Sequence, residues 1–131
     1  MASIEEAIRT MLTSGGTLSA AGVPDARVTH SYRLQSTVFP AVTYEVTDTT
    51  LASSSGLNVS TVNVSAIAEL TMDAVDLLPT IRDRLEDLDT YSTIAIVGVV
   101  VNNEATAPPS VGLGDEQEPA TATIQALVYW S

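Results

Sequence analysis

Few residues of this chain have side chains suited to catalysis. His30 is the only histidine, and there is no cysteine. A Ser-His-Asp triad would have to include His30, but no Gly-x-Ser-x-Gly motif presents a serine to it. His30 is in phase with Val28 and Tyr32, which indicates a structural histidine in a strand. The sequence therefore predicts no catalytic residue, no cofactor and no enzymatic activity.

Two groups of acidic residues are candidate cation ligands. They are Asp83, Glu86, Asp87 and Asp89 in one group, and Asp115, Glu116 and Glu118 in the other. Carboxylate oxygens suit Mg²⁺ and Ca²⁺, but neither group has the regular ligand spacing of an EF-hand. A solvated acidic surface is the simpler interpretation, so no metal site is predicted.

The charge balance is the most unusual total. Sixteen acidic residues stand against five basic ones, all arginine, and the net charge is -11. This charge opposes binding to nucleic-acid phosphates, and the absence of lysine excludes a P-loop. Low lysine with many Asp, Glu and Thr residues is typical of proteins from extreme halophiles, where molar salt screens self-repulsion. An ordinary acidic protein is the alternative.

Length and hydropathy predict one globular domain over residues 1–131. With 45% hydrophobic residues the chain is long enough to bury a core. The longest apolar run, Ile94 to Val101, is far shorter than the roughly 20 residues that span a bilayer. The acidic N-terminus lacks the basic region of a signal peptide. We expect a soluble protein made inside the cell.

The first helix has clear signals at both ends. Ser3 and Glu6 form a capping box, and apolar residues then recur at helical spacing up to Thr13. Gly15-Gly16 supplies a left-handed stop. A short turn from Leu18 to Ala21 is expected to follow.

Three strands are predicted next, over Arg27–Arg33, Pro40–Asp48 and about Val59–Leu70. The second alternates strictly, with its apolar residues on one side and Thr43, Glu45 and Thr47 on the other. Its apolar side consists of Val42, Tyr44 and Val46. Val59 is out of phase in the third strand, which suggests a bulge or a late start. A Thr, Ser and Gly-rich hairpin loop over Thr49–Gly56 joins these two strands.

The second half predicts a helix and a hairpin. The helix is expected broadly from Met72 to Asp87 with a kink at Pro79; in the alternative, Asp76 is the N-cap and Pro79 lies in the first turn. Thr93–Val101 is almost continuously apolar, as in a central strand covered on both faces. The helices would cover one face, and a neighbouring subunit is a candidate for the other. A long acidic loop over residues 102–119 leads to an alternating strand over 120–130, antiparallel to Thr93–Val101.

These elements define an α+β fold with the order αβββαββ. We expect an antiparallel sheet of four to five strands with two helices packed on one face. The apolar central strand and the long loop suggest a contact surface rather than a pocket. The candidate interface residues are Thr43, Glu45, Thr47, Arg27, Arg33, Arg82, Arg84, Asp115, Glu116 and Glu118. Intrachain or solvated arginines remain the alternative for the basic residues.

In this order the elements resemble the tail-completion, or tail-terminator, family of tailed viruses. The resemblance rests on the Ser3–Arg9 helix, the Phe39–Tyr44 strand, the strand around Val62–Ala68 leading into a helix, and the closing hairpin. The resemblance covers most of the chain. Its motifs are architectural patterns rather than catalytic signatures. The interruption at Pro79, the acidic loop and the absence of lysine depart from the family pattern.

The resemblance implies a structural virion protein in the tail or neck. Such a protein forms a ring, usually a hexamer, that ends the tail tube and joins it to head–tail connector proteins. The genome would pass through the lumen without specific binding, and no membrane would be involved. Assembly in the host cytoplasm is expected, and the composition suggests a haloarchaeal virus. The alternatives are another neck or connector component, a minor capsid protein, or a small monomeric binding domain that uses the 102–119 loop.

Overall fold

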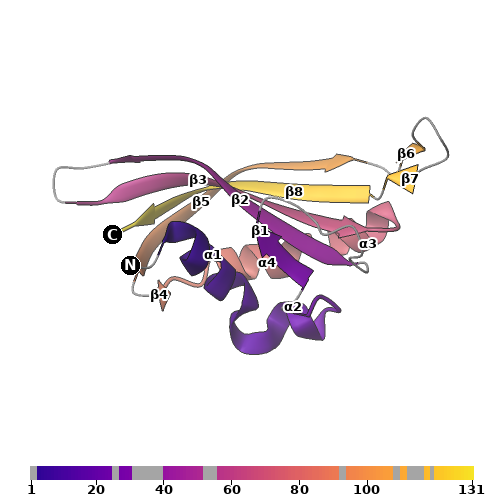
Figure 1. Ribbon diagram of the computed structural model, residues 1–131, viewed down its shortest axis with the longest axis horizontal. Helices are drawn as coiled ribbons and strands as arrows, with labels where there is room; N and C mark the ends of the chain where they lie inside the picture. Colours follow the sequence, from indigo (N-terminus) through magenta and orange to yellow (C-terminus); the bar gives the residue numbers. More distant parts are fainter. Residues whose placement is uncertain are drawn as a thin grey trace.

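The computed structural model describes residues 3–24, 27–30, 40–51, 56–91, 94–107, 110–111, 117–118 and 120–131. These residues form a six-stranded sheet with the helices on one of its faces (Figure 1). The helical elements are α1 (Ile4–Thr13), η1 (Ser14–Gly16), α2 (Thr17–Ala20), α3 (Thr71–Asp76) and α4 (Leu78–Leu85). The strands are β1 (Val28–His30), β2 (Ala41–Leu51), β3 (Asn58–Ala68), β4 (Thr90–Tyr91), β5 (Ile94–Ala107) and β8 (Ala120–Trp130), with a separate hairpin of β6 (Ser110–Val111) and β7 (Gln117–Glu118).

The α+β class is confirmed, but the predicted strand count and order are wrong. The strands lie in the order β1-β2-β3-β8-β5-β4, six rather than four or five. β1 also runs parallel to β2, so the sheet is mixed. β4 is a two-residue strand, too short to give a periodic signal in the sequence.

Helix α1 begins and ends where its sequence signals predict. The Glu6 backbone N–H donates to Ser3 Oγ at 3.2 Å, which satisfies one of the free donors of the first turn. Gly15 and Gly16 have φ values of 74° and 68°, so they turn the chain through the left-handed region into α2. The expected short turn after the glycines is therefore the helix α2.

The predicted inner face of β2 is confirmed. Val42 and Tyr44 are buried, and Val46 packs against the same core at its margin. The alternation continues on the two central strands, where every second residue is buried on the helix side. Leu70 differs from the prediction: β3 ends at Ala68, and Leu70 is 62% exposed as the residue before α3.

The predicted irregularity near Val59 lies in the partner strand instead. β3 pairs with β8 without a break, whereas β2 has a register shift between Val46 and Asp48. Thr47 is therefore the extra residue of a β-bulge. Regular alternation along β3 places Ser60 in phase with Val62 on the buried side. Ser60 is fully buried but well bonded: its hydroxyl lies 2.8 Å from Thr49 Oγ1 and accepts from Trp130 Nε1 at 2.8 Å.

The single kinked helix over Met72–Asp87 is wrong. Two helices, α3 and α4, meet at Leu77, and Pro79 lies in the first turn of α4. Proline has no N–H to donate, and the first turn is where that loss costs least. The alternative start near Asp76 is close to the observed one, but the N-cap is Leu77 and has no side-chain capping bond.

β5 is less central than predicted. Its pairing with β8 is confirmed, but among the described residues only Ile94 and Ala95 pair with β4 along its other edge. Val97 and Val100 are 53% and 52% exposed within one chain, and cover of this face by a neighbouring subunit stays a prediction. The strand also continues to Ala107: of residues 102–107, predicted as loop, 103–107 pair with β8 and Asn102 lies in a register shift. A run of β-branched residues indicates a strand but does not fix how many of its faces are covered.

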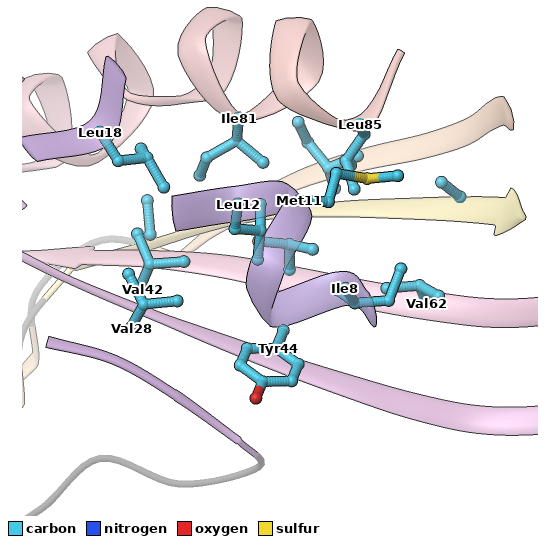
Figure 2. Packing of buried hydrophobic residues seen from close by; sticks show 14 of the residues in the cluster. Ile8, Met11, Leu12, Leu18, Val28, Val42, Tyr44, Val62, Ile81 and Leu85 are labelled. Carbon is cyan, nitrogen blue, oxygen red and sulfur yellow. The ribbon is translucent and has the colours of Figure 1, made fainter. Parts of the chain in front are cut away.

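One continuous core lies between the helices and the sheet. Figure 2 shows Ile8, Met11 and Leu12 of α1 between the strand residues and the side chains of α4. Arg84 of α4 links this helix to α1, because its Nε donates to the Met11 carbonyl at 3.0 Å. No described helix is long and apolar enough to cross a membrane.

Candidate assembly surfaces

The sheet has one face without helices (Figure 1). The pairing registers arrange the residues of this face in rows across four strands. The pairing registers of β2, β3, β8 and β5 place these residues side by side. Three successive rows are Thr43–Ser65–Thr123–Ala105, Glu45–Asn63–Gln125–Asn103 and Asp48–Thr61–Leu127–Val100. The next row is Thr50–Val59–Tyr129–Gly98. We call these four rows the open face.

The open face is mainly polar and uncharged, and it contains no basic residue in these rows. Side chains on its middle strands are half-buried, because neighbours in the sheet shade one another. Ser65 and Thr123 share a hydrogen bond of 2.9 Å across β3 and β8. The charged members are Glu45 and Asp48, so the electrostatic character of this face is acidic.

Three predicted interface residues lie on β2. Thr43 and Glu45 are on the open face as expected, with Thr43 half-buried and Glu45 exposed. Thr47 occupies the bulge, and its hydroxyl donates to the Thr61 carbonyl at 3.4 Å. The structure thus brings two of these three side chains onto one surface, while the bulge takes Thr47 out of the regular rows.

The described arginines among the candidates make contacts within the chain. Arg82 pairs with Glu86 at 3.1 Å and with Glu104 at 3.3 Å. Arg84, mostly buried, pairs with Asp87 at 3.0 Å in addition to its bond to α1. Arg27 Nη1 donates to the Pro40 carbonyl at 3.2 Å. These contacts favour the intrachain alternative, and an interface role for the three residues stays a prediction.

The acidic loop residues stay predictions as well. Asp115 and Glu116 lie outside the described residues, as does Arg33. Glu118 belongs to the short strand β7, which pairs with β6. His30 is exposed, and its ring centroid lies 5.3 Å from that of Tyr44.

A hollow of about 490 Å³ lies between the end of α2, the start of β2 and helix α3. Its lining includes Glu69, Asp73 and Asp76 beside the apolar Ala68 and Leu77. Among the described residues no group of three or more acidic or histidine side chains is arranged to hold a metal ion. The hollow is therefore an acidic surface feature with no chemistry assigned to it.

Both edges of the sheet have long stretches without a described partner, which the sequence did not reveal. On one edge, β1 covers β2 only at Val42–Tyr44. On the other, β4 covers β5 only at Ile94–Ala95, and the Ile96 N–H donates to the Asp89 carbonyl at 2.9 Å. Unpaired edge strands carry rows of free backbone donors and acceptors, which can pair with another chain. No side-chain pattern could have shown this, because edge positions depend on strand order.

The fold is similar to one found in a virus-like particle. A chain in the structure titled "Virion of native gene transfer agent (GTA) particle" superposes with a TM-score of 0.59 and 15% sequence identity, over 94% of this chain and 92% of that chain. A scan against models of protein families and a search of curated proteins found no match. The likeness at this identity establishes a shared fold.

Proposed function

We propose that this protein is a structural component of a virion, without enzymatic activity. The observation that carries the proposal is the similarity over nearly the full length to a chain of the gene transfer agent virion. Two features of the described part of the chain support it: one polar sheet face is free of helices, and β2 and β5 have long edge stretches without a described partner. A virion protein must present surfaces to several neighbours.

Within the virion, the proposed role is a ring that ends the tail tube and joins it to the neck, with six copies as the family resemblance implies. The tail tube protein, the connector proteins and other copies of this chain would be its partners. We propose that the open face lines the lumen. Its acids Glu45 and Asp48, with no basic residue in the rows, would repel DNA phosphates and let the genome slide through.

The rival roles are another neck or connector component, a minor capsid protein, and a monomeric binding domain using residues 102–119. The binding domain has less support from the structure, because residues 102–107 belong to β5 and residues 110–111 pair with 117–118 rather than forming a free loop.

The mass of the purified protein in molar salt tests the proposal. Light scattering should give one discrete species of about six times the 13.7 kDa chain mass if the resemblance holds. A protein that stays monomeric at high concentration would favour the binding domain. Adding assembled tail tubes is the control for a ring that forms only on its template.

A further inference from the structure

We infer that the unpaired edge of β5 pairs with the unpaired edge of β2 in a second copy of this chain, so that one continuous sheet passes from subunit to subunit. The inference deepens the proposed ring and rests on it. The partner is another copy of this chain, joined by backbone hydrogen bonds between edge strands.

The first argument is the position of the two free edges. Among the described residues, β1 ends its cover of β2 at Tyr44, so no described strand pairs with this edge of β2 from Glu45 to Leu51. On the other side, described cover of β5 ends at Ile96, so its outer edge has no described partner from Val97 onward. In the registers across the sheet, Glu45 shares a row with Asn103 and Thr50 shares a row with Gly98. The two open edges therefore lie at the same level of the sheet.

The equal level of the two open edges determines whether the assembly is a ring or a filament. A second copy can bring its β2 against β5 by rotation alone, with no shift along the strands. A head-to-tail contact that rotates without translating closes into a ring, whereas one with translation gives an open filament. The window spans about seven residues, or roughly 24 Å of strand.

The second argument is strand direction. β2, β3, β8 and β5 are antiparallel in turn, so β5 runs opposite to β2 within one chain. A copy rotated about an axis along the strands keeps its β2 direction. Its β2 therefore runs antiparallel to the neighbouring β5, and the alternation continues unbroken across the joint.

The third argument is the chemistry of the edge. Natural proteins protect open edges with lysine, proline or bulges. Val97–Val101 contains neither lysine nor proline, and Val97 and Val100 are half exposed. Both edge strands contain register shifts, next to Asp48 in β2 and at Val97 and Asn102 in β5. Bulges bend and twist strands, as a sheet that closes on itself requires.

Cysteine pairs test the joint directly, because the chain has no cysteine of its own. Without a shift along the strands, Asp48 of one copy faces Val100 of the next, since both belong to one row. We would prepare Asp48→Cys/Val100→Cys, and also Asp48→Cys with Gly98→Cys or with Asn103→Cys to cover neighbouring registers. Oxidation in molar salt should give a ladder of covalent oligomers that stops at the size of the ring.

Thr61→Cys/Val100→Cys is the matched control. Thr61 is in the same row but on β3, which is flanked by β2 and β8, so it should give no intersubunit disulfide. Rings in light scattering without cross-linking in any edge pair would overturn the joint while leaving the ring role intact. A cross-linked ladder with no upper limit would support the joint but contradict closure. Monomers that do not cross-link would contradict both.

A charge exchange gives a second readout on intact protein. Val100→Asp places an acid opposite Asp48 and should move assembly to higher protein concentration, the more so as salt is lowered, because like charges directly opposite destabilise strand pairing. Combining it with Asp48→Lys should reverse this shift. The same assembly curve for Val100→Asp and the unmodified protein at every salt concentration would overturn the inference.

Discussion

Replacing Tyr44 by Ala is expected to lower the free energy of unfolding by about 3 to 5 kcal/mol, as for other large aromatic side chains removed from a core. Tyr44 is 4% exposed and lies at the β2 side of the core, below α1 in Figure 2. Burial raises the pKa of its hydroxyl. Arg9 lowers that pKa to a smaller extent, and Glu5 and Glu6 raise it. The surrounding helix and sheet cannot collapse fully into the space that the ring would leave.

Urea unfolding in molar salt measures this loss, with Glu45→Ala as the matched control. Glu45 is the next residue but points to the open face and is exposed, so its removal should change stability by about 0.5 kcal/mol or less. Tyr44→Phe should keep most of the stability, because the ring still fills the site. Equal losses for Tyr44→Ala and Glu45→Ala would contradict the assignment of the two faces.

The second large effect is expected on removal of salt. Each copy has a net charge of -11, and a ring brings several copies together. The Debye length rises from about 3 Å at 1 M salt to about 10 Å at 0.1 M, so repulsion between neighbouring subunits is no longer screened. Dialysis to low salt should therefore reduce the measured mass from that of the ring to that of the monomer, with loss of folded structure at still lower salt.

Light scattering and circular dichroism along a salt series measure this transition. Glu45→Gln/Asp48→Asn should shift it to lower salt, because both acids lie on the open face near the proposed joint. A protein that keeps both its fold and its mass after dialysis would contradict the halophilic hypothesis. The chain would then be an ordinary acidic protein, which is the alternative interpretation of its composition.

The parts of the fold that local chemistry determines were predictable. α1 follows from a cap at Ser3, a helical apolar repeat and the glycines that end it. The alternation of β2 and β8 predicted their buried faces, because a two-residue period leaves only one way to cover the apolar side.

The parts that depend on neighbours were not predictable. Residues 102–107 have no apolar alternation, yet they form strand because β8 offers them backbone partners. The bulge at Thr47 moves the phase of β2 without any glycine or proline to signal it. Pro79 in the sequence was compatible with a kink in one helix or with the start of a new helix. The structure has a new helix, because the chain breaks at Leu77.

The candidate surface was predictable only in part. Thr43 and Glu45 lie on the open face as their alternation indicated. The arginines of α4 have acids at helical spacing in the sequence, Glu86 four residues after Arg82 and Asp87 three residues after Arg84. The other partner of Arg82, Glu104 on β5, became visible only in three dimensions. The free edges of β2 and β5 depend on strand order, which the sequence does not encode in any local pattern.

Imaging the neck of the virion at a resolution that separates strands tests the central claim most directly. The account predicts a ring of copies of this chain at the end of the tail tube, with one sheet running continuously from β5 of each copy to β2 of the next and the open face toward the lumen. Finding this chain at another position in the particle, or as isolated copies whose sheet edges do not meet, would contradict it.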